Sequence, residues 1–135
     1  MSLDEKRNTR DYLYGRLLAL ADHIEESALR KASEKRATNA TRYMQQFSQH
    51  PFRTWNQIHY ALTPYIVRLG GAGYYKSLIA EVKELFVSPE DYMNDKPLSG
   101  EYLLGYYCQR QKLWEKVKKD EPSQEVEGNN ESTEE

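Results

Sequence analysis

The sequence has few of the residues on which secreted, membrane and redox proteins depend. Its single cysteine, Cys108, excludes an internal disulfide and a zinc site built from several thiolates. No apolar run approaches the roughly eighteen residues of a membrane span, and residues 1–7 are charged where a signal peptide would be apolar. We therefore expect a soluble, cytoplasmic protein with no membrane partner, in which Cys108 is a buried structural thiol.

The sequence also lacks the patterns that mark catalytic and cofactor sites. His23, His50 and His59 are far apart and do not have the spacing of metal ligands. There is no serine nucleophile elbow, and residues 70–73 lack the lysine and serine of a phosphate-binding loop. We expect no catalytic residue, no metal, no cofactor and no small-molecule substrate, and hence a protein that is not an enzyme.

Charge is distributed unevenly along the chain. All 19 Lys and Arg lie in residues 1–119 with 14 of the 21 acids, which gives that part a net charge of plus five. Residues 120–135 carry the other seven acids, no base and almost no apolar side chain. Because such a segment cannot offset the entropy of ordering, we predict one helical domain over residues 1–119 and a disordered acidic tail over 120–135.

Apolar residues recur at helical spacing, and no segment alternates with the period of a strand. The predicted helices cover residues 11–31, 33–48, 51–69, 74–86 and 100–119, with one short turn after Ser88. We expect Pro64 to bend the third helix without breaking it, and Gly70 and its neighbours to end it. The prediction is an all-α fold, a compact bundle of about five helices.

The last predicted helix contains an arginine in an unusual place. Its apolar face is predicted to comprise Tyr102, Leu103, Tyr106, Leu113, Trp114 and Val117. Arg110 projects from the middle of this face, so we expect it to be a structural anchor paired with a carboxylate or with helix-end carbonyls, and DNA contact is the alternative. Glycine inside a helix costs about 1 kcal/mol relative to alanine, so Gly15 and Gly105 are predicted to allow two helices to approach closely.

Basic residues form two groups that are candidates for binding. One group, around the junction of the first two helices, comprises Arg30, Lys31, Lys35, Arg36 and Arg42. A second forms a stripe of Lys112, Lys116 and Lys119 on the last helix. Such groups can follow a phosphate backbone without reading bases, although solvated helix faces carry the same residues. Arg16 is expected on the polar face of the first helix with Arg30, and Glu25 and Glu26 are expected to be solvated.

Four blocks of the sequence resemble one known family. They are YLYGRLLA at 12–19, ATNATRY at 37–43, PF at 51–52 and YLLGYYCQRQKLW at 102–114. They resemble the C-terminal helical region of the type I-C CRISPR large-subunit family. A free-standing chain that begins at this point resembles the small subunit of the type I-C Cascade complex, which is made from an internal start within the large-subunit gene.

The resemblance implies a non-enzymatic helical subunit of an RNA-guided surveillance complex in antiviral defence. Its implied partners are the large subunit, the repeated backbone subunit, further copies of itself, guide RNA and target DNA. The implied role is to stabilise the R-loop and the displaced DNA strand, and a basic body suits this role because base pairing reads the sequence in such complexes. The alternative is an adaptor that scaffolds neighbouring subunits without touching nucleic acid. The predicted nucleic-acid-binding residues are Arg16, Arg30, Lys31, Lys35, Arg36, Arg42, Lys112 and Lys116.

Overall fold

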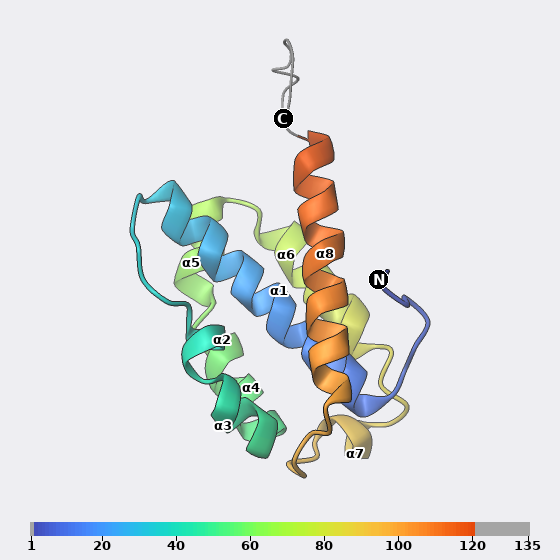
Figure 1. The fold of residues 1–135 in the computed structure, drawn as a ribbon. Coiled ribbons are helices and arrows are strands. Elements are labelled where there is room, and N and C mark those ends of the chain that lie inside the picture. Colours follow the sequence, from blue (N-terminus) through green and yellow to red (C-terminus); the bar gives the residue numbers. More distant parts are fainter. Residues whose placement is uncertain (1, 121–135) are drawn as a thin grey trace.

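Helix α1 (Arg10–Lys31) runs through the middle of the protein, and the other helices pack around it (Figure 1). The computed structural model describes residues 2–120, with side chains as far as residue 115. Fifteen of the 22 residues of α1 are buried, so the helix contacts neighbours on nearly every side. Residues 121–135 of the predicted acidic tail lie outside the described part of the chain.

Seven further helices follow α1 in the described residues. They are α2 (Asn39–Arg42), α3 (Met44–Gln49), α4 (Pro51–Tyr60), α5 (Thr63–Leu69), α6 (Ala72–Lys83), α7 (Pro89–Tyr92) and α8 (Glu101–Asp120). Five of the eight are substantial, and residues 2–120 contain no strand. The prediction of an all-α bundle with about five main helices is therefore confirmed.

Two predicted helix ranges were wrong. The chain from Ala32 to Thr38 is not helical, because Ser33 has a positive φ of 57° and the Thr38 hydroxyl accepts a hydrogen bond from the Thr41 N–H as the N-cap of α2. The third predicted helix is broken between α4 and α5 rather than bent at Pro64. The reason is that Pro64 has no N–H to continue the helix and instead occupies the first turn of α5.

Helices α1 and α8 approach each other most closely at two glycines. An added Cβ on Gly15 would lie 1.9 Å from the Tyr102 carbonyl oxygen, and one on Gly105 would lie 2.1 Å from the Tyr12 carbonyl oxygen. No side chain fits in either position, so the backbones of the two helices are in direct contact. This is the close approach that a glycine inside a helix indicates, and it fixes how α8 lies across α1.

The buried face of α8 is narrower than predicted. Its buried residues in the described part are Gly105, Tyr106, Cys108, Gln109 and Leu113. Leu103 is 36 % exposed and Trp114 is 55 % exposed, so the prediction that both face the core was wrong. Because α8 crosses α1 at the glycine contact, one narrow stripe of α8 faces inward. The side chain of Val117 lies beyond those that the structure describes.

Candidate nucleic-acid interface

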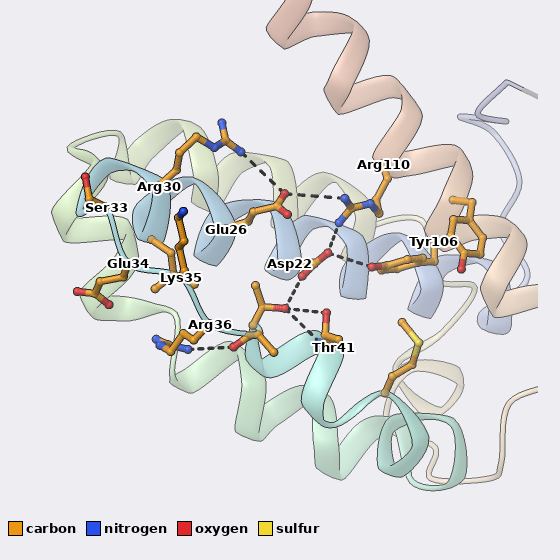
Figure 2. A pocket seen from close by; sticks show the side chains of 15 residues that line it. Asp22, Glu26, Arg30, Ser33, Glu34, Lys35, Arg36, Thr41, Tyr106 and Arg110 are labelled. Atoms are coloured by element: carbon orange, nitrogen blue, oxygen red, sulfur yellow. Dashed lines mark hydrogen bonds and ion pairs between the residues drawn. The ribbon is translucent and has the colours of Figure 1, made fainter.

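A cleft of about 820 Å³ opens between α1, residues 32–38 and α8 (Figure 2). Its charged lining consists of four cations and three acids: Arg30, Lys35, Arg36, Arg110, Asp22, Glu26 and Glu34. The segment 32–38 is not helical: residues 32–33 form a turn, and the chain then carries Lys35 and Arg36 along the rim opposite α8. The cleft therefore brings together cations from three parts of the chain.

The Asp22 carboxylate joins the three walls of this cleft. Its side chain is 4 % exposed and accepts hydrogen bonds from the Thr38 hydroxyl, from the Tyr106 hydroxyl at 2.9 Å and from Arg110 Nη1. Burial, with the nearby Asp22 charge, raises the pKa of Tyr106, so its hydroxyl stays protonated and donates. Through these contacts a single carboxylate on α1 holds the start of α2 and the middle of α8.

A second buried carboxylate, Glu25, positions the non-helical segment 32–38. Glu25 is 1 % exposed and accepts from Arg36 Nη1 and from the Asn39 backbone N–H, both at 2.8 Å. Arg36 Nη2 also donates to the Tyr65 hydroxyl at 2.6 Å. The hydrogen bond to Glu25, followed by that to Tyr65, raises the pKa of Arg36. The expectation that Glu25 is solvated was wrong, because Arg36 compensates its charge.

Arg110 has carboxylate partners on α1. Its Nη1 contacts Asp22, and its Nη2 lies 3.8 Å from Glu26 Oε1. Arg30 Nη2 lies 3.9 Å from the same Glu26 oxygen (Figure 2). Burial alone would lower the pKa of Arg110, but its interactions with Tyr106, Asp22 and Glu26 outweigh burial and raise that pKa. Arg110 is therefore anchored at one nitrogen and faces the cleft with another.

The remaining cations near the cleft are less constrained. Lys35 is exposed and has no hydrogen bond or ion pair to any described residue. Lys31 turns away toward α5, where its ammonium donates to the Arg68 carbonyl oxygen at 2.9 Å. Arg42 is exposed and lies over the Tyr43 ring, 5.5 Å from its centroid.

Two predicted binding residues do not join this group, and a third is not described by its side chain. Arg16 is 8 % exposed and donates from Nε to Gln109 at 2.8 Å, so its predicted place on a polar face was wrong. Burial lowers the pKa of Arg16. Lys112 Nζ lies 3.9 Å from Glu5 Oε2. Lys112 lines a separate small cavity between α8 and residues near the N-terminus, together with Cys108. The Lys116 side chain lies outside the described ones.

Sequence reasoning missed the two buried carboxylates and two exposed rings. Asp22 interrupts an otherwise uncharged run at 17–24, and this interruption is a signal that could have identified it. Tyr107 and Trp114 are each 55 % exposed on α8. Tyr107 lines the large cleft, and Trp114 lines a neighbouring cavity of about 420 Å³. Their exposure follows from the crossing of α1 and α8, which the sequence does not state.

The described residues give no sign of a metal centre or a membrane span. Within residues 2–120 no three His, Cys, Asp or Glu side chains gather as metal ligands. None of the helices in this part is long and apolar enough to cross a bilayer.

Comparison with known proteins gives one family. The model of the family described as CRISPR-associated protein (Cas_Csd1) matches residues 1–114. No curated protein sequence matches the chain. Because the family match covers most of the 135 residues, the chain belongs to the CRISPR-associated Csd1 family and is a type I-C Cascade-related protein.

Proposed function

We propose that this chain is a non-catalytic small subunit of a cytoplasmic type I-C Cascade complex and contacts nucleic acid through the cleft between α1, residues 32–38 and α8. In this role it lies beside the large subunit, the repeated backbone subunit and further copies of itself. It stabilises the R-loop formed by guide RNA and target DNA, together with the displaced DNA strand. It uses no cofactor, and base pairing supplies the sequence specificity.

The observation that carries the proposal is the convergence of cations on one cleft. Arg30 comes from α1, Lys35 and Arg36 from the non-helical segment 32–38, and Arg110 from α8, yet all four line the same space of about 820 Å³. Cations on both walls of a cleft can contact successive phosphates of one strand, and such contacts position a nucleic acid without reading its bases.

The contacts of each cation refine the predicted set. Lys35 and Arg30 are the best candidates to meet phosphates, because Lys35 has no described partner and Arg30 has only the long pair with Glu26. Arg42 lies exposed at the end of α2 and extends the group. Arg36 serves chiefly to compensate Glu25, and Arg16 is buried. We therefore place the phosphate contacts at Arg30, Lys35 and Arg42, and leave out Lys31, whose ammonium is bonded to the Arg68 carbonyl oxygen.

The test is the salt dependence of binding to single-stranded DNA. A triple variant with Arg30, Lys35 and Arg42 each changed to Gln should bind oligonucleotides of different sequence more weakly by the same factor. The slope of log K against log salt should flatten by about 0.7 for each phosphate that the variant no longer binds. The matched control changes Lys6, Lys76 and Lys96 to Gln, which removes the same charge elsewhere on the chain. Equal slopes for the two triple variants would contradict the proposal.

A second candidate function is a protein adaptor that does not touch nucleic acid. It is favoured by two apolar side chains near the α4–α5 break, because Tyr60 is 86 % exposed and Val67 is 71 % exposed. An adaptor would co-purify with the other subunits, but the isolated chain would show no salt-sensitive binding to single-stranded DNA. Changing Tyr60 and Val67 to Ser would then release the chain from the complex, whereas the Gln triple variant of the cleft would not.

A further inference from the structure

We propose that Arg30 and Arg110 form a phosphate-binding site that the Glu26 carboxylate occupies until nucleic acid displaces it. The inference rests on the proposed contact with nucleic acid and goes further. It identifies one position for a phosphate, between Arg30 and Arg110, which we call the seat, and a carboxylate of the same chain, Glu26, that competes for this position. In this arrangement Glu26 holds the two arginines ready and at the same time weakens binding.

The geometry of the three side chains supports a shared anion position. The same oxygen, Glu26 Oε1, lies 3.9 Å from Arg30 Nη2 and 3.8 Å from Arg110 Nη2. Both distances exceed the roughly 3.2 Å limit of a good N–H to oxygen hydrogen bond. Glu26 therefore lies between two cations and makes no hydrogen bond to either. A phosphate carries more acceptor oxygens and can accept from both guanidinium groups at once.

The exposure of the side chains makes this exchange possible. The side chains of Arg30, Glu26 and Arg110 are 60 %, 46 % and 36 % exposed, so solvent and ligand reach all three. Ion pairs with such exposure are weak and are screened by salt. Arg110 is nevertheless fixed, because its Nη1 is anchored on the buried Asp22 carboxylate while its Nη2 points to Glu26. A phosphate that replaces Glu26 meets a guanidinium group that is already in place.

The surroundings of the seat suit an unpaired strand. Glu26, Arg30 and Arg110 line both the large cleft and the neighbouring cavity of about 420 Å³, so the seat lies where the two meet. Tyr107 on one side and Trp114 on the other are half exposed and offer ring faces on which bases can stack. A phosphate at the seat thus places its flanking bases near an aromatic ring.

The experiment compares Glu26→Gln with the matched variant Glu34→Gln in the full chain. Glu34 lines the same cleft, its side chain is 49 % exposed, and it pairs with Arg68 at 3.8 Å, so the two variants remove equivalent charges. The probe is an oligothymidylate of about 15 nucleotides, within the range of single-strand site sizes. Binding is followed by the fluorescence of Trp114, since Trp55 is fully buried. We expect Glu26→Gln to bind about fivefold more tightly than the natural chain and Glu34→Gln to bind within about twofold of it.

A double-mutant cycle tests whether the gain in affinity that Glu26→Gln produces depends on Arg30. In a chain that already carries Arg30→Gln, adding Glu26→Gln should give less than half of the gain that it gives alone. Equal gains for Glu26→Gln and Glu34→Gln, or a full gain in the Arg30→Gln background, would overturn the inference and leave the proposed function standing. If the natural chain and both glutamine variants bind no oligothymidylate at low salt, the proposed function fails together with the inference.

Discussion

The two ends of the α1–α8 pair are built in opposite ways. At the crossing, defined by Gly15 and Gly105, the helix backbones touch and exclude side chains (Figure 1). Farther along, where α1 and α8 diverge, carboxylates of α1 meet Arg110 beside an open cleft (Figure 2). We call these regions the closed end and the open end. The difference shows how contact at one end fixes the angle of two helices and leaves charged groups accessible at the other.

The largest expected effect is at the closed end. Gly105→Ala would place a methyl group 2.1 Å from the Tyr12 carbonyl oxygen, and neither backbone can move without separating α1 from α8. Because overpacking against backbone has no flexible side chain to absorb it, we expect a loss of about 3 kcal/mol in the free energy of unfolding. Urea unfolding followed by circular dichroism measures this loss.

Gly73→Ala is the matched control for that substitution. Gly73 lies in α6, and a Cβ added there would meet nothing within 4 Å. Replacing a helical glycine by alanine in open space should stabilise the chain by about 0.5–1 kcal/mol. If Gly105→Ala were as stable as Gly73→Ala, the close contact at the closed end would be disproved.

An intermediate effect is expected at the open end. Arg110→Ala leaves the buried Asp22 carboxylate with Tyr106 and Thr38 as its remaining side-chain donors. A fully buried pair broken on one side costs about 3–5 kcal/mol, and we expect about 2 kcal/mol here because the Arg110 side chain is 36 % exposed. Urea unfolding again gives the value.

Arg30→Ala sharpens the comparison within the open end. Arg30 meets Glu26 alone, at 3.9 Å and with 60 % of its side chain exposed, so its loss should change stability by less than about 0.5 kcal/mol. Arg30→Ala should instead weaken the binding of single-stranded DNA. A stability loss for Arg30→Ala as large as that for Arg110→Ala would show that the open end does not divide into an anchor and a ligand-facing residue.

The sequence predicted the closed end better than the open end. A glycine inside an apolar helix has few explanations other than close packing, so Gly15 and Gly105 indicate the crossing directly. The all-α class follows from periodicity, which is a local property of the chain. The open end depends on Glu25 and Asp22, whose burial is decided by partners 11 to 88 residues away in the sequence. No local pattern identifies such partners.

The errors in the predicted helices have the same origin. Residues 33–38 have helical composition, but hydrogen bonds from Arg36 and Asn39 to Glu25 hold them in a non-helical conformation. Arg16 shares a heptad position with Arg30 on a helix that was predicted to have a polar face. Because other elements contact α1 on nearly every side, Arg16 is buried and does not lie on a polar face. Arg30, near the end of the helix, is exposed as predicted.

The smallest expected effect is the pH dependence of the open end, through His23. Burial, followed by the charges of Arg30 and Arg110, lowers the pKa of His23 below its ordinary 6.5. Near pH 6.5 the unfolded chain therefore binds a proton at His23, whereas the folded chain binds it only at lower pH. The contribution of His23 to the free energy of unfolding is full above pH 6.5 and is lost as the pH falls.

His59 provides the comparison from outside the open end. It stacks on Trp55 in α4, and burial followed by the charge of Lys83 lowers its pKa in the same direction. Urea unfolding at about pH 7 and about pH 5.5 should show a loss of stability on acidification that His23→Gln and His59→Gln each reduce by less than about 1 kcal/mol. In a chain that carries Arg30→Gln, the part of this stability loss that is due to His23 (the His23 share) should be smaller, because one of the cations that repel the imidazolium is gone. The part that is due to His59 should not change. If Arg30→Gln left the His23 share unchanged, the charge of Arg30 would not act on the His23 imidazole, and burial with the charge of Arg110 would account for the lowered pKa.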